Sequence, residues 1–190
     1  DVDAERIMTR VAFLGLGHMG LPMAKNLVAA GHEVHGFDLV PAAIEAARAA
    51  GIPVAASGAE AVADAEVVVT MFPAGKHVIE AYRTELLSAA RPGTLFIESS
   101  TIAVDEARAA HALALAAGHR HIDAPVSGGV VGAEAGTLAF MVGGSDDAYA
   151  AAQPVLEPMA GKVIHCGATG SGQAAKVCNN MVLAVSQIAV

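Results

Sequence analysis

The chain of 190 residues has no tryptophan, and phenylalanine and tyrosine together make up only 4% of it. Charged residues account for 16% of the sequence, the net charge is −8, and lysine and arginine form no cluster. A negatively charged chain without a basic patch is poorly suited to nucleic acid or to an anionic membrane. We therefore expect neither as a partner.

Long hydrophobic runs are also missing, and cysteine is scarce. The longest apolar runs, such as EVVVTMF at 66–72, fall far short of the about 18 residues that a membrane-spanning helix needs. Cys166 and Cys178 have no CxxC or zinc-type spacing, so they could form a disulfide or be two buried thiols. We expect two thiols in a cytoplasmic protein.

The eight histidines show no pattern that is typical of a metal site. His119 and His121 alternate along a predicted strand and therefore share a face, but no third ligand type clusters near them. The sequence predicts no metal ion.

Apolar residues, by contrast, make up 54% of the chain and occur in short runs that alternate with helical stretches. This alternation predicts an α/β fold, a Rossmann-like, doubly wound and mostly parallel sheet. The predicted strands are 11–15, 33–38, 54–55, 66–72, 94–98, 121–123, 139–142 and 163–165. The predicted helices are 19–30, 41–50, 77–89, 104–117 and 146–156. From Ser171 onward, apolar residues at spacings of three and four predict one more helix, which continues to the last residue.

A glycine-rich turn joins the first predicted strand to the first helix. In VAFLGLGHMGLPMAKNL, Gly15, Gly17 and Gly20 form the G-x-G-x-x-G pattern of a dinucleotide-binding loop. Gly15 allows the tight turn, Gly17 lets the backbone approach a pyrophosphate, and Gly20 lets the helix pack closely on the strand. The pyrophosphate would lie at the helix N-terminus, where free N–H groups favour an anion.

The second predicted strand ends at an acid, Asp38, 18 residues after Gly20. A carboxylate at this position accepts hydrogen bonds from ribose hydroxyls and repels the 2′-phosphate of NADP. Alternatively, Asp38 only caps the helix that begins near Pro41. Leu39 and Val40 follow without a basic residue, so we expect NAD as the cofactor.

Three later loops are placed to reach a cofactor or substrate at the carboxyl ends of the strands. Phe72 and Pro73 present an apolar edge suited to nicotinamide or ribose, and Thr101 offers a hydroxyl. The segment 127–129 offers a serine hydroxyl and two unobstructed backbone N–H groups, which suit a carboxylate. Each of these loops could instead be a simple turn.

Lys176 and Asn180 lie four residues apart and therefore on one face of the last predicted helix. A lysine is usually solvated, but this one stands among apolar neighbours rather than charges, which favours burial. Burial lowers the pKa of a lysine and suits it to transfer protons near neutral pH.

Four segments, in this order, resemble the β-hydroxyacid dehydrogenases: GLGHMGLPMAKNL, SSTI, DAPVSGGVVGAEAGTLAFMVGG and GSGQAAKVCNNMVLA. The resemblance covers nearly the whole chain. The cofactor-binding residues that it implies are Gly15, Gly17, His18, Met19, Gly20, Asp38, Phe72, Pro73, His77 and Thr101, with a histidine at 77 where an asparagine is expected. The substrate-binding residues that it implies are Ser127, Gly128, Gly129 and Asn180, and the implied general acid/base is Lys176.

The resemblance implies NAD-dependent oxidation of a small 3-hydroxyacid to its semialdehyde, with 3-hydroxyisobutyrate of valine breakdown as the expected substrate. Two alternatives stay open: a related reductase of 2-hydroxy-3-oxopropionate, and a dinucleotide-binding module without turnover. Lys176 together with Asn180 favours an enzyme, because a module that only binds has no use for a buried acid/base pair.

The resemblance also implies a second domain. Members of the family continue past the last helix into an all-α domain that closes the cleft and supplies the dimer contact. We therefore expect an NAD-binding domain at 8–167 and, at 168–190, the start of a long interdomain helix leading to an all-α domain absent from this chain. A homo-oligomer, dimer or tetramer, is expected through that domain.

Overall fold

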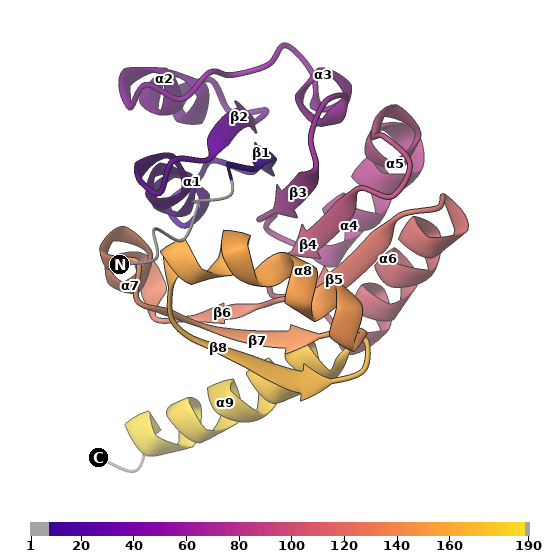
Figure 1. The fold of residues 1–190 in the computed structure, drawn as a ribbon. Helices are drawn as coiled ribbons and strands as arrows, with labels where there is room; N and C mark the ends of the chain where they lie inside the picture. The colour runs from indigo at the N-terminus through magenta and orange to yellow at the C-terminus, as the bar shows by residue number, and fades with distance from the viewer. Residues whose placement is uncertain (1–7, 189–190) are drawn as a thin grey trace, which may run out of the picture.

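The computed structural model describes residues 8–188, in which helices cover both faces of a mixed sheet (Figure 1). The sheet has eight strands in the order β2-β1-β3-β4-β5-β7-β6, with β8 paired to β7. The strands are β1 (Arg10–Leu14), β2 (Glu33–Phe37), β3 (Val67–Thr70), β4 (Leu95–Glu98), β5 (Arg120–Asp123), β6 (Val126–Ser127), β7 (Leu138–Gly143) and β8 (Ala160–Gly167). The first five are parallel, β7 runs antiparallel to β5 and β6, and β8 is parallel to β7. The predicted Rossmann-like, mostly parallel sheet is confirmed.

The helices divide between the two faces of the sheet. One face is covered by α1 (Gly20–Ala29), α2 (Pro41–Ala49) and α8 (Asp146–Leu156). The other is covered by α3 (Gly58–Val62), α4 (Gly75–Ala81), the π-helical turn η1 (Tyr82–Leu86), α5 (Leu87–Ala89) and α6 (Val104–Ala116). The remaining helices are α7 (Gly129–Ala135), the short 3₁₀ turn η2 (Glu157–Met159) and α9 (Ser171–Ile188).

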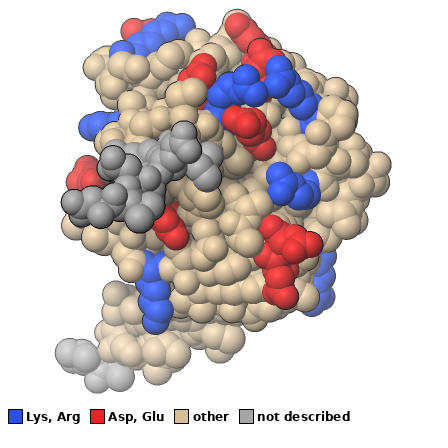
Figure 2. Space-filling model, in the orientation of Figure 1, with Lys and Arg blue, Asp and Glu red and all other residues tan. Residues whose placement is uncertain are grey.

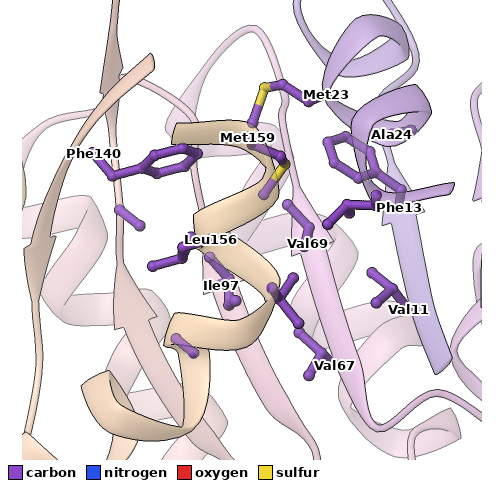
Figure 3. Packing of buried hydrophobic residues seen from close by; sticks show 14 of the residues in the cluster. Val11, Phe13, Met23, Ala24, Val67, Val69, Ile97, Phe140, Leu156 and Met159 are labelled. Carbon is purple, nitrogen blue, oxygen red and sulfur yellow. The ribbon is translucent and has the colours of Figure 1, made fainter. Parts of the chain in front are cut away.

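The strands carry the core on both sides, because successive side chains of a strand point to opposite faces. On β1, Val11 and Phe13 pack on the α1 and α8 side, and Ala12 and Leu14 pack on the α6 side. Figure 3 shows the first of these layers, with side chains from strands, α1 and α8 between the backbone elements. Burial of both faces explains why these strands have nearly continuous apolar sequences.

The final helix, α9, leaves the body of the molecule (Figure 1). Every residue from Asn180 to Ile188 is exposed, whereas the first turns of the helix are packed against β7 and β8. The interdomain helix expected at 168–190 includes residues 189 and 190, which lie outside the described residues. None of the helices in residues 8–188 has the length and apolarity required to cross a membrane.

The structure corrects the sequence interpretation in four places. Val54 forms only an isolated bridge with Gly36, not a strand. The stretch predicted as one helix at 77–89 contains a π-helical turn, η1. The segment after Pro125 forms the two-residue strand β6 and the helix α7, and residues 58–62 form α3, where no helix was predicted. Elements this short carry too few residues to show a hydrophobic period, and glycines mark the start of both added helices.

The start of α1 depends on the absence of a side chain at Gly20. A Cβ there would overlap the carbonyl oxygen of Gly15 and come within 3.0 Å of the ring of Phe13. Because the obstacle includes backbone, we expect Gly20→Ala to lower the free energy of unfolding by about 1 to 3 kcal/mol or more, measured by urea denaturation. Gly17→Ala is the matched control, since nothing lies within 4 Å of its Cβ position. Equal stability of the two variants would contradict this packing argument.

Candidate cofactor and active site

The glycine loop lies at the carboxyl end of β1, whose neighbours in the sheet are β2 and β3. The chain passes from β1 to β2 on one side and then from β2 to β3 on the other side of β1, and ligands of doubly wound sheets bind at such a switch point. Gly15 has a φ of +93°, and a Cβ on it would overlap the carbonyl oxygen of Met71 just after β3. The loop therefore packs against the end of β3 in a form that only glycine allows.

An anion would fit in front of this loop. Gly17 is exposed, and the place where its Cβ would be has no atom within 4 Å. His18 and Met19 follow Gly17 and lead into the N-terminus of α1, where Met19 is the N-cap. His18 is exposed and Met19 is half-buried. The first turn of α1 contains no acidic residue that would compete for its N–H groups. The loop offers the open cradle and positive helix end that a pyrophosphate requires.

Asp38 connects the glycine loop to the end of β2. Its Oδ2 accepts a hydrogen bond from the N–H of Leu16 at 2.6 Å, and its Oδ1 accepts one from the N–H of Val40 at 2.8 Å. The N-cap residue of α2 is Val40, so Asp38 stands two residues before the cap position. Each carboxylate oxygen has a second lone pair, which leaves acceptors for the hydroxyls of a ribose.

The other predicted cofactor contacts lie at the ends of β3 and β4, next to the glycine loop. Phe72 is half-buried, and its N–H donates to the hydroxyl of Ser100 at 2.8 Å. Pro73 and Thr101 are exposed, and His77 is exposed in the first turn of α4. The structure thus gathers these residues at one edge of the sheet, and their contacts with a cofactor stay a prediction.

Ser127 ends β6, and the two glycines after it turn the chain into α7. Gly128 and Gly129 have φ values of +134° and +62°, a conformation that disfavours any residue with a side chain. The hydroxyl of Ser127 accepts a hydrogen bond of 3.4 Å from the side-chain amide of Asn179 on α9. Asn180, the asparagine predicted from the sequence, is exposed, and its role stays a prediction. Asn179 continues the three-residue spacing of the buried face of α9, which is the signal that could have identified it.

Lys176 is buried, as its apolar neighbours predict, with only 9% of its surface exposed. It is the one charged residue of α9, and its side-chain amine makes no hydrogen bond or ion pair with any of residues 8–188. Loss of contact with water lowers the pKa of this amine, because the charged form loses its hydration without gaining a counter-ion. A buried amine of this kind suits proton transfer.

Asp123, at the end of β5, accepts hydrogen bonds from the start of α9. Its Oδ1 lies 2.7 Å from the N–H nitrogen of Gly170, and its Oδ2 lies 3.0 Å from that of Gln173. These are N–H groups without partners inside the helix, so Asp123 serves as the cap of α9 from a distant strand. Burial raises the pKa of Asp123, and the backbone hydrogen bonds oppose that rise.

Glu98, which the sequence analysis did not single out, is the register partner of Asp123 on β4 and is completely buried. Its Oε1 accepts from the N–H of Ser100 at 2.7 Å, and its Oε2 lies 3.5 Å from the amide nitrogen of Gln173. Burial raises the pKa of Glu98 to about 8, and the nearby carboxylates of Asp123 and Glu106 add to the rise. Glu98 is therefore a neutral acid at pH 7. The sequence did contain a signal for Glu98: two acidic residues, Glu98 and Asp123, end consecutive predicted strands.

The cysteines and histidines lie elsewhere. Cys166 is half-buried and Cys178 is exposed, and both are free thiols, so the disulfide alternative is wrong and so is the expected burial of Cys178. His119 and His121 are buried, in aromatic contacts with Phe96 and Tyr82. Within residues 8–188, histidine, cysteine and acidic side chains form no group of three that could hold a metal ion.

Residues 10–167 match the family described as the NAD-binding domain of 6-phosphogluconate dehydrogenase. A probable 3-hydroxyisobutyrate dehydrogenase of Mycobacterium tuberculosis is 63% identical over 183 residues, and an NAD-dependent L-serine dehydrogenase of Pseudomonas aeruginosa is 50% identical over 183 residues. These alignments cover 96% and 95% of this chain. The chain belongs to the β-hydroxyacid dehydrogenase family.

The β-hydroxyacid dehydrogenase fold is equally clear in a solved relative. A structure of 3-hydroxyisobutyrate dehydrogenase from Mycobacterium tuberculosis with L-serine superposes with a TM-score of 0.94 at 63% identity. The match covers 96% of this chain and 62% of that one. The chain therefore contains the NAD-binding domain of this family and spans 62% of the length of each of the two Mycobacterium tuberculosis relatives.

The neutral state of Glu98 has a consequence for stability. Its pKa of about 8 in the folded protein is above the ordinary value of 4.5, so the folded state binds the proton more tightly. Between these two pH values the unfolded chain has lost the proton and the folded chain retains it. The free energy of unfolding therefore falls as the pH rises, by at most about 1.4 kcal/mol per pH unit. We expect Glu98→Gln, which is neutral at every pH, to lack this slope in urea denaturation.

The measured quantity is the difference between wild type and Glu98→Gln at each pH. His121, whose pKa burial lowers to about 3, contributes a slope of the opposite sign below its ordinary value of 6.5. That contribution is common to both proteins and cancels in the difference. A difference that stays constant between about pH 5 and about pH 8 would show that Glu98 is not held neutral.

Proposed function

We propose that the protein that carries this chain oxidises a small 3-hydroxyacid to its semialdehyde with NAD, and that 3-hydroxyisobutyrate is its first candidate substrate. The observation that carries the proposal is Lys176, a buried amine without a counter-ion in the described part of the chain, on a helix held at the end of β5 by Asp123. The name of the 63% identical relative supports the choice of substrate. Oxidation of 3-hydroxyisobutyrate would place the protein in valine breakdown.

The residues of the glycine loop and the first strand ends would hold the cofactor. Backbone N–H groups at the start of α1 would bind the pyrophosphate, and the oxygens of Asp38 would accept hydrogen bonds from the ribose. Phe72, Pro73 and Thr101 would flank the nicotinamide end, with His77 at the rim. NAD, when bound, accepts the hydride that leaves the substrate.

The substrate would be held and deprotonated by residues of the second half of the chain. The Ser127 hydroxyl and the N–H groups of Gly128 and Gly129 would bind its carboxylate. Lys176, as a neutral amine, would take the proton of the hydroxyl group and return it in the reverse reaction. An asparagine of α9 would orient the substrate, either Asn180 or Asn179, which already contacts Ser127.

L-serine is a second candidate substrate. One relative is named an NAD-dependent L-serine dehydrogenase, and the solved relative is described with L-serine. Both candidates carry a carboxylate and a hydroxyl group on the β-carbon, so the same groups of the protein can bind either. They differ at the α-carbon, where one has a methyl group and the other an ammonium group.

Three further features belong to the proposal. We propose a division into an NAD-binding domain at 8–167 and a helical segment from 168 onward, and assembly into a homo-oligomer. Support for assembly comes from α9, whose projecting end is uncharged (Figure 2) and exposes Val182, Val185 and Ile188. The two free thiols suit a reducing compartment such as the cytoplasm.

A screen of NADH formation tests the proposed reaction in the full-length protein. The substrates are 3-hydroxyisobutyrate, L-serine, 3-hydroxypropionate, glycerate and 4-hydroxybutyrate, the last as a control for the position of the hydroxyl. We expect the highest kcat/KM for 3-hydroxyisobutyrate. Lys176→Met should lower kcat roughly 10²- to 10⁴-fold, the usual loss for a general acid/base, and should leave NAD affinity nearly unchanged.

Lys162→Met is the matched control, because Lys162 is exposed on β8. Near-normal kcat in Lys176→Met would refute the role of this lysine. NAD binding without NADH formation from any of the five substrates would support the alternative of a module that only binds.

Asp38 should determine the choice between NAD and NADP. We expect calorimetric titration to show tighter binding of NAD than of NADP by the wild type, because the carboxylate bonds the ribose and repels a 2′-phosphate. Asp38→Ala should weaken NAD binding about 10- to 100-fold, the range for a lost hydrogen bond to a charged group. It should also reduce the difference in affinity between NAD and NADP. Glu33→Ala, at the exposed start of the same strand, is the control for the charge change. Equal affinity of the wild type for both cofactors would contradict the prediction.

A further inference from the structure

Gln173 lies one helical turn before Lys176 on the buried face of α9, and none of its surface is exposed. Its side-chain nitrogen donates to the carbonyl oxygen of Ser100 at 2.7 Å, and its side-chain oxygen accepts from the N–H of Ile102 at 3.2 Å. The same nitrogen lies 3.5 Å from Glu98. A single amide thus bonds both sides of the loop 99–102 that follows β4.

This loop is connected to the proposed cofactor contacts. Thr101 lies between the two residues that Gln173 bonds, and the Ser100 hydroxyl accepts the N–H of Phe72 at 2.8 Å. Hydrogen bonds therefore run from the end of β3, through the loop after β4, to the turn of α9 that precedes Lys176.

The start of α9 also lies close to the ends of β5 and β7. A Cβ on Gly172 would overlap the carbonyl oxygen of Met141 and come within 2.8 Å of the carboxylate of Asp123. A Cβ on Gly143 would come within 2.5 Å of the same carboxylate. The backbone of the first turn is held by these contacts, so the side chain of Gln173 is what joins this turn to the loop 99–102.

We propose that Gln173 is a positioning residue that fixes Lys176 relative to the cofactor-binding ends of β3 and β4. This inference rests on the proposed function, in which Lys176 transfers the proton. Proton and hydride transfer both require fixed geometry, and a displacement of about 1 Å can cost about 10²-fold in rate. An amide suits the position because the loop presents one carbonyl oxygen and one N–H group to it.

A carboxyl group at position 173 could do this only while it is protonated. The titratable and charged groups around the site are Glu98 on β4, His121 and Asp123 on β5, Glu106, Arg108 and His111 on α6, Tyr82 on η1, Cys166 on β8 and Lys176 on α9. The neighbouring carboxyl groups and the burial would both favour the neutral form of an introduced glutamate. As the pH rises, the ionised form would have no donor for the carbonyl oxygen of Ser100.

The test uses Gln173→Met, Gln173→Glu and a control variant, Gln187→Met, at the exposed end of the same helix. Activity is measured as kcat across pH in the full-length protein, and NAD affinity is measured by calorimetry. A second readout needs no turnover. These 190 residues contain four lysines and so contribute few NMR signals after reductive ¹³C-methylation, and the titration of the Lys176 signal, assigned with Lys176→Arg, reports its pKa.

We expect Gln173→Met to lower kcat about 10- to 100-fold with NAD affinity within about threefold of wild type. The pKa of Lys176 should move back toward its ordinary value of 10.5, because the amine gains contact with water. Gln173→Glu should retain kcat within about threefold of wild type at the acid end of the range and lose it progressively as the pH rises. Gln187→Met should change none of these quantities.

An unchanged kcat and an unchanged pKa of Lys176 in a folded Gln173→Met would overturn the proposal. If that variant does not fold, Gln173→Glu decides the question: a pH-dependent loss relative to wild type supports the proposal, and a ratio independent of pH overturns it. If the wild type oxidises none of the hydroxyacids, the proposed function has failed. The NMR titration then still shows whether Gln173 holds Lys176 in its buried position.

Discussion

The carboxylate of Asp123 holds the first turn of α9 against the end of β5, and the position of Lys176 follows from that contact. The carboxylate replaces the hydrogen bonds that the first N–H groups of a helix cannot make within the helix. Glycines at 143 and 172 allow backbone to approach it closely. Together with the bonds from Gln173 to the loop 99–102, this contact places the lysine relative to the sheet, because the far end of α9 projects into solvent.

Burial, together with the same contact, determines which carboxyl group of the site carries the charge. Glu98 and Asp123 are neighbours in register on parallel strands, with no cation bonded to either among residues 8–188. Two such carboxyl groups cannot both ionise at low cost. Asp123 receives the N–H groups of a helix start and is the better candidate for the charge, whereas Glu98 remains neutral. Burial lowers the pKa of Lys176 in these surroundings, which makes its neutral form more accessible than that of an exposed lysine.

The two halves of the site differ in how they are built. In the cofactor half, the glycine loop is joined to Asp38 by a contact between residues close in sequence, Asp38 with Leu16, 22 positions apart. The catalytic half joins residues 50 or more positions apart, as in the bonds from Gln173 to Asp123 and to Ser100. A short segment can therefore specify the glycine loop with Asp38, whereas the catalytic half forms only when β4, β5 and α9 come together.

The sequence by itself determined the alternation of strands and helices, the glycine loop with Asp38, and the burial of Lys176, because each depends on local spacing or on apolar neighbours. It could not determine α7, the π-helical turn, or the buried set of Glu98, Asp123 and Gln173. Nor could it decide which asparagine of α9 meets Ser127. Asn179 and Asn180 differ by only one position on the helix, and the rotation of α9 about its axis was decided by tertiary packing, where its glycine-containing first turn rests on the end of β5.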